Sequence, residues 1–170
     1  TVPLFVNDRK DNAPYILTET GCRLILLEDM AQWQGICATN DCLTEINRII
    51  VLQPTSSMSG DKIEMSGSHA APKGTRDARI SSLKEWLPED AGKYQVRTTK
   101  SGALATIVYT SGTTGKPKGV MLSHANILEN AFACLQRQAI YPEDLFLSFL
   151  PLSHTFERTV GYYIPMMAGS

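Results

Sequence analysis

The chain has 170 residues, 43% hydrophobic and 19% charged, which is typical of a globular protein large enough for one domain with a real core. Its formal net charge of −1, with both signs intermixed, excludes a strongly basic surface for nucleic acid or for an acidic membrane. The sequence also contains no apolar run near the roughly 20 residues that span a bilayer, and it does not open with a signal-peptide pattern.

The first third of the chain predicts strands that alternate with helices. Three runs rich in apolar and β-branched residues have strand length: residues 2–6, 23–28 and 48–54. Asp11 or Asn12 is a suitable N-cap for a helix with Pro14 in its first turn and Gly21 at its end. A second helix is predicted over residues 29–36.

Residues 55–80 break this rhythm, because Ser, Gly, Pro and charged residues dominate there, and they predict a long surface loop. One helical turn is expected within 81–90. It would dock Leu83, Trp86 and Leu87 onto the body of the protein.

The second half predicts three more strands, at residues 103–109, 119–122 and 144–150. Ser123 is the expected N-cap of a helix over about 124–138. Five apolar residues share one face of that helix: Ile127, Leu128, Ala131, Phe132 and Leu135. Strands separated by helices indicate an α/β fold, with a parallel sheet built from βαβ units and flanked by helices.

The four cysteines, Cys22, Cys37, Cys42 and Cys134, stand at unrelated spacings. This pattern fits neither a disulfide framework nor a zinc site, so we expect reduced, packed thiols in a cytoplasmic protein. The chain starts without Met and ends without a tail. We interpret it as a piece of a longer protein.

Residues 110–119 follow a predicted buried strand and read Thr-Ser-Gly-Thr-Thr-Gly-Lys-Pro-Lys-Gly. Glycines let backbone N–H groups approach an anion, hydroxyls donate to phosphate oxygens, and lysines supply positive charge. The stretch therefore predicts a polyphosphate-binding loop. The alternative is an ordinary hairpin turn that happens to be rich in Gly and Thr. The ordinary P-loop is excluded, because its pattern needs glycine five positions after Gly112, where Pro117 stands.

The stretch YTSGTTGKPKGVMLSH resembles the phosphate-loop signature of the adenylate-forming (AMP-binding) enzymes, which include acyl-CoA synthetases, luciferases and peptide-synthetase adenylation domains. The segment LSFLPLSHTFERTVGYYIPMMAG (147–169) is similar to long-chain fatty acid–CoA ligases, and we expect a bacterial enzyme of this kind. The opening 28 residues and SLKEWLP resemble the same group. Residues 55–80 show no resemblance to this family, so it implies nothing about their role.

The resemblance implies an enzyme that joins a carboxylate to ATP and then passes the acyl group to coenzyme A. It places the β- and γ-phosphates in the loop, with Thr110 near Mg²⁺, Lys118 as the principal phosphate-facing lysine and Lys116 as a secondary one. The other implied loop residues are Ser111, Gly112, Thr113, Thr114 and Gly115.

The resemblance also makes His154 the candidate catalytic residue, beside the reacting carboxylate and the α-phosphate. Taken alone, a histidine at this position is more often structural. We interpret Glu157 and Arg158 as a structural or gating pair and His124 as structural; His69 carries no signal. Apolar residues within 160–167 line either a fatty-acyl channel or a helix core.

The resemblance implies parts that these residues lack: an adenine-binding segment with its acidic magnesium ligand, a ribose-binding Asp and a C-terminal domain with a catalytic lysine. The chain is thus expected to be an incomplete N-terminal domain, inactive alone and prone to self-association through an unpaired sheet edge. Expected partners are fatty acid, ATP and coenzyme A, with no nucleic acid. Peripheral membrane contact of the parent protein stays open. Two alternatives remain, another acyl- or aryl-adenylating enzyme and a nucleotide-binding module without turnover.

Overall fold

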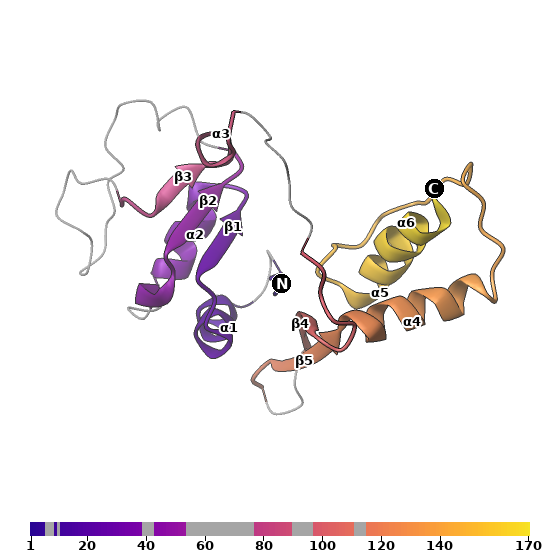
Figure 1. Cartoon of the computed structure of the whole chain (residues 1–170). Helices are drawn as coiled ribbons and strands as arrows, with labels where there is room; N and C mark the ends of the chain where they lie inside the picture. Colours follow the sequence, from indigo (N-terminus) through magenta and orange to yellow (C-terminus); the bar gives the residue numbers. More distant parts are fainter. Residues whose placement is uncertain (6–8, 10, 39–42, 54–76, 90–96, 111–114) are drawn as a thin grey trace. The chain divides into compact units, whose positions relative to one another are not determined.

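A computed structural model describes residues 1–5, 9, 11–38, 43–53, 77–89, 97–110 and 115–170. The chain divides into two compact units (Figure 1). One unit is Val6–Gln95, and the other combines Thr1–Phe5 with Val96–Ser170.

The Val6–Gln95 unit contains a three-stranded parallel sheet in the order β1-β2-β3, with bounds Leu24–Leu27, Arg48–Val51 and Ile80–Ser82 (Figure 1). In the register, Ile49 of β2 lies opposite Ile25 on one side and Ile80 on the other. Residues 49–51 of β2 are fully buried, as expected for a central strand covered on both faces. The α/β class with a parallel sheet is confirmed.

The helices of this unit are α1 (Asn12–Thr20), α2 (Met30–Cys37), the 3₁₀ turn η1 (Leu43–Glu45) and α3 (Leu83–Trp86). Helix α1 ends where predicted, at Gly21, whose φ of 59° is left-handed and suits glycine. Helix α2 begins after Asp29, whose carboxylate accepts a hydrogen bond of 3.0 Å from the Gln32 N–H. The bounds of both helices agree with the prediction to within one residue.

Three predictions for this part of the chain need correction. Residues 2–5 form no strand, although Thr1 is hydrogen-bonded to strand β4 of its own unit. Residues 80–82, assigned from the sequence to the end of the long loop and to a helical turn, form strand β3 instead, because they pair with β2. Trp86 and Leu87 are 45% and 49% exposed and therefore do not dock, whereas Leu83 is half-buried. Most of the predicted 55–80 loop lies outside the described residues.

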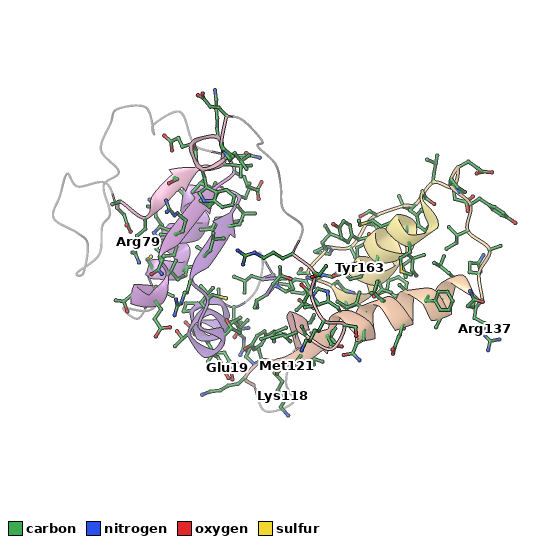
Figure 2. All side chains as sticks on the ribbon, in the orientation of Figure 1. Glu19, Arg79, Lys118, Met121, Arg137 and Tyr163 are labelled. Carbon is green, nitrogen blue, oxygen red and sulfur yellow. The ribbon has the colours of Figure 1, made fainter. Side chains whose placement is uncertain are left out.

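Arg79, labelled in Figure 2, lies directly before β3 and is hydrogen-bonded to the turn around η1. Its Nη1 donates to the carbonyls of Leu43 and Ile46 at 3.0 and 3.1 Å. Its Nε and Nη2 donate to the Asp77 carboxylate at 3.0 and 2.8 Å. The guanidinium also lies 5.8 Å from the ring centre of the buried Trp33. The hydrogen bonds from the Arg79 side chain to the Asp77 carboxylate hold the pKa of Asp77 below its ordinary value of 3.8.

Replacement of Asp77 by asparagine is expected to destabilise the Val6–Gln95 unit by no more than about 1 kcal/mol at neutral pH, because the Asp77–Arg79 pair is partly exposed. The folded pKa of Asp77 is depressed, so its stabilisation is present above about pH 3.8 and is lost as the pH falls through the folded pKa. Urea unfolding followed by tryptophan fluorescence measures this unit, which contains both tryptophans, Trp33 and Trp86. The exposed Glu89→Gln is the control. If the difference in unfolding free energy between wild type and Asp77→Asn does not change with pH, the stabilisation does not come from the charge of Asp77.

The second unit begins with an antiparallel hairpin, β4 (Leu104–Thr110) and β5 (Lys118–Ser123), followed by α4 (His124–Leu135). Ser123 caps α4 as predicted, accepting a hydrogen bond of 3.2 Å from the Asn126 N–H. A helical run follows at α5 (Thr155–Arg158), continues as one π-helical turn, η3 (Thr159–Tyr163), and ends as α6 (Ile164–Ala168). Helix α4 packs against η3 and α6 (Figure 1).

The π-helical turn has a cause in the sequence. Pro165 has no N–H for the carbonyl of Gly161 four residues earlier, and its ring crowds that carbonyl. A widened turn relieves both problems.

Three predictions for this unit differ from the structure, wholly or in part. The β4–β5 pair is antiparallel, so here the chain turns back directly instead of through a βαβ crossover. The predicted strand 144–150 is irregular, and Leu145, Leu147 and Phe149 are 99%, 84% and 71% exposed, because no strand among the described residues pairs with it. On α4, Ala131 is buried as expected, but Leu128 and Phe132 are more than half exposed.

Candidate active site

The glycine-rich stretch connects the two strands of the β4–β5 hairpin. Thr110 lies directly opposite Lys118 in the register, as the pair next to the loop. Paired residues of an antiparallel ladder place their side chains on the same face, so the Thr110 hydroxyl and the Lys118 ammonium share one face of the hairpin. Both residues are exposed, and Lys118 lies at the loop end of β5 (Figure 2). The hairpin alternative and the phosphate-loop prediction are therefore compatible.

The loop is described only in part. Ser111, Gly112, Thr113 and Thr114 lie outside the described residues. Gly115 has a φ of 86°, a left-handed conformation that favours glycine over residues with a Cβ. Lys116 is exposed and follows it directly.

Gly119 is fixed by packing instead of by its φ angle. A Cβ at this position would lie 2.9 Å from the Ile107 Cγ2, closer than real contacts allow, and 3.0 Å from the Tyr109 Cζ, a contact tight enough that the ring would have to shift. Tyr109 is the cross-strand partner of Gly119. The aromatic ring thus occupies the space that a side chain next to Lys118 needs.

His154 is the N-cap of helix α5 and is exposed. Its Nδ1 accepts a hydrogen bond of 3.3 Å from the Phe156 N–H, and its carbonyl accepts one of 3.1 Å from the Arg158 N–H. An accepting Nδ1 requires that the neutral imidazole carries its proton on Nε2. His154 therefore has both a structural part as a cap and a donor that can reach an anion.

Glu157 and Arg158 do not form an ion pair with each other among the described residues. The Arg158 Nη1 donates to the Thr106 hydroxyl and its Nε to the Leu152 carbonyl, both at 3.1 Å. Glu157 is 3% exposed, and its Oε1 has no hydrogen-bond partner in the described part of the chain. This oxygen lies against Gly161, where a Cβ would overlap with it. The two neighbours thus have separate surroundings, contrary to the interpretation as a pair.

The sequence profile of a family described as AMP-binding enzyme matches residues 1–170. The chain belongs to the AMP-binding enzyme family. Among curated relatives, it is 38% identical over 87 residues to long chain acyl-CoA synthetase 7, peroxisomal, of Arabidopsis thaliana, covering 51% of this chain and 12% of that protein. It is 27% identical over 172 residues to the long-chain-fatty-acid–CoA ligase ACSBG2 of Xenopus laevis, covering 99% of this chain and 22% of that protein. The chain thus spans less than a quarter of either relative.

Solved structures share the fold of this family member. The anthranilate CoA ligase AuaEII, in complex with anthranoyl-AMP, superposes with a TM-score of 0.78 at 17% identity, over 99% of this chain and 29% of that one. ATP-bound MatB from Rhodopseudomonas palustris gives a TM-score of 0.72 at 22% identity, over 99% and 28%.

Two residues of this AMP-binding chain were not singled out from the sequence. Thr106 is a buried polar residue inside the apolar run of β4, and that position is itself a signal for a hydrogen-bonding role. Gly119 had no such signal, because only the register shows that Tyr109 lies opposite it.

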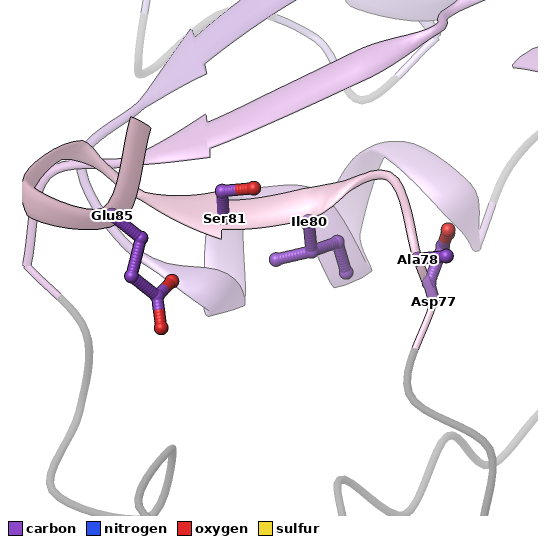
Figure 3. A pocket seen from close by; sticks show the side chains of 5 residues that line it. All are labelled: Asp77, Ala78, Ile80, Ser81 and Glu85. Carbon is purple, nitrogen blue, oxygen red and sulfur yellow. The ribbon is translucent and has the colours of Figure 1, made fainter. Parts of the chain in front are cut away.

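The other unit has an open depression of about 450 Å³, lined by Asp77, Ala78, Ile80, Ser81 and Glu85 (Figure 3). Both of its carboxylates already have partners, since Asp77 binds Arg79 and the Glu85 Oε2 accepts from the Ser82 N–H at 2.9 Å. The depression contains none of the predicted phosphate-binding residues. The described residues also include no cluster of three metal-ligating His, Cys, Asp or Glu side chains, and no helix of membrane-spanning length and apolarity.

Cys22, Cys37 and Cys134 are free thiols, as predicted, and Cys42 lies outside the described residues. Burial raises the pKa of the Cys37 thiol above its usual range. The thiolate form of Cys37 is therefore less populated than that of an exposed cysteine.

Proposed function

We propose that this chain is an incomplete N-terminal domain of an ATP-dependent long-chain fatty acid–CoA ligase. The enzyme would first form an acyl-adenylate and pyrophosphate, and then transfer the acyl group to the thiol of coenzyme A. The observation that carries the proposal is the Thr110–Lys118 pair at the base of a glycine-rich hairpin loop, in a chain that belongs to the AMP-binding enzyme family. The names of the curated relatives support long-chain fatty acids as substrates.

A carboxylate is a poor electrophile, and adenylation gives it a good leaving group. The Lys118 ammonium would bind the β- and γ-phosphates and offset the negative charge that accumulates on the departing pyrophosphate. The remaining loop residues, Ser111 to Gly115 with Lys116, would contribute hydroxyls, backbone N–H groups and a second positive charge.

The Thr110 hydroxyl fits Mg²⁺ as a hard oxygen ligand and would complement the phosphate oxygens of ATP, since Mg²⁺ is usually held by few protein groups. Bound there, the ion would supply charge neutralisation to the triphosphate. His154 would orient the fatty-acid carboxylate or the α-phosphate through its Nε2–H, because Nδ1 is used in the cap of α5. The location would be cytoplasmic, and the isolated chain would self-associate.

In a coupled pyrophosphate-release assay, the full-length protein is expected to turn over palmitate with ATP, Mg²⁺ and coenzyme A, and the 170-residue chain is expected to show none. The 170-residue chain is expected to be inactive because it spans less than a quarter of the length of either relative. Turnover by the purified chain, abolished in its Lys118→Ala variant, would show that the 170 residues suffice. That variant is the control for a contaminating enzyme.

The same assay separates the alternatives. Turnover of benzoate or anthranilate in preference to palmitate indicates an aryl-adenylating enzyme. ATP binding by the full-length protein, without pyrophosphate release for any carboxylate, indicates a nucleotide-binding module.

A further inference from the structure

Arg158 connects two backbone segments that flank the candidate active site. Its Nη1 donates to the Thr106 hydroxyl on β4, four residues before Thr110. Its Nε donates to the carbonyl of Leu152, two residues before His154. One guanidinium therefore joins strand β4, which leads into the candidate phosphate loop, to the segment that leads into His154, the candidate catalytic residue.

The Thr106 hydroxyl makes two hydrogen bonds, one as donor and one as acceptor. It donates its single proton to the Thr1 carbonyl at 2.9 Å and accepts the Arg158 proton with a lone pair. Thr106 is only 2% exposed, so water cannot easily take over either bond. A hydroxyl serves as donor and acceptor at once, whereas an isosteric valine serves as neither.

Arg158 is also close to His154 through the helix itself. Its backbone N–H donates to the His154 carbonyl at 3.1 Å, and its side chain donates to the Leu152 carbonyl, two residues before His154. We propose that Arg158, held by Thr106, is a positioning residue that fixes His154 relative to strand β4, which ends at Thr110. This inference rests on the proposed function.

The expected consequence is kinetic, because displacement of a catalytic group by about 1 Å can cost up to 100-fold in rate. Loss of the Arg158–Thr106 hydrogen bond should therefore lower the kcat of adenylation. The KM for ATP should change little, because the residues proposed to bind ATP stay in place. A purely structural contact would lower the melting temperature and leave kcat of the folded enzyme unchanged.

The test measures palmitate-dependent ATP–pyrophosphate exchange by the full-length protein and four variants. Thr106→Val and Arg158→Lys are expected to lower kcat by about 10-fold or more, with the KM for ATP within about 2-fold of wild type. Lysine keeps the charge but not the two-sided geometry of guanidinium. Thr106→Ser restores the hydroxyl and should restore kcat. Arg137→Ala, at an exposed residue in the turn after α4, is the matched control (Figure 2).

Hydrogen exchange of the Phe156 amide gives a readout that does not need activity. The Phe156 N–H donates to the His154 Nδ1, so its exchange is expected to accelerate in Thr106→Val and not in Thr106→Ser. Should Thr106→Val fail to fold, Arg158→Lys serves for both measurements.

The outcomes are distinguishable. If the wild-type protein shows no ATP–pyrophosphate exchange with any carboxylate, the proposed function is refuted. In an active protein, variants with wild-type kcat refute the positioning role. Unchanged Phe156 protection in Thr106→Val and Arg158→Lys refutes it even without activity.

Discussion

Replacement of Lys118 by alanine is expected to lower the rate of acyl-adenylate formation by the full-length protein by about 100-fold, the usual cost of removing one group that stabilises developing charge. The hairpin register predicts a larger effect at Lys118 than at Lys116. Lys118 is fixed opposite Thr110 beside the loop, whereas Lys116 lies within the loop after Gly115. Lys116→Ala should therefore cost less. Pyrophosphate exchange at saturating palmitate measures both variants.

Lys100→Ala is the matched control, because Lys100 is an exposed lysine of the same unit that precedes β4. A Lys118→Ala enzyme within about 2-fold of the Lys100→Ala enzyme would remove Lys118 from the phosphate site. Equal losses at Lys116 and Lys118 would indicate that total loop charge matters more than the position in the register.

Replacement of Gly119 by alanine is expected to destabilise the β4–β5 hairpin by about 1–2 kcal/mol, the range for an added methyl without space. The new Cβ would overlap with the Ile107 Cγ2 and with the ring of Tyr109, which must move. Because Gly119 is adjacent to Lys118, the displacement should also reduce ATP-dependent activity. Hydrogen exchange of the β4 and β5 amides reports directly on the hairpin.

Gly102→Ala is the control, because a Cβ at Gly102 meets no atom within 4 Å. It precedes β4 in the same unit and should leave hairpin exchange unchanged. Equal acceleration in both variants would mean that loss of glycine flexibility, and not the contact with Tyr109, is responsible.

The sequence predicted the ends of helices well where the signal was local. Ser123 followed by an apolar face predicted α4, and Gly21 predicted the end of α1, because capping depends on neighbouring residues. It failed where the signal was long-range. The apolar run 144–150 has strand composition, but a strand also needs a partner, and among the described residues it has none. Strand β3 is the opposite case, since its pairing with β2 makes a strand of three unremarkable residues.

The sequence by itself determined the residue types of the candidate site: a Gly/Thr-rich loop with two lysines, and a histidine before a short helix. Only the tertiary structure decided how these residues combine. The antiparallel register places Thr110 opposite Lys118, Tyr109 takes the space at Gly119, and Arg158 joins the helix of His154 to Thr106. The physical reason is that the functional group of a residue is given by its type, which the sequence states directly. Each of these contacts, by contrast, joins segments that come together only when the chain folds.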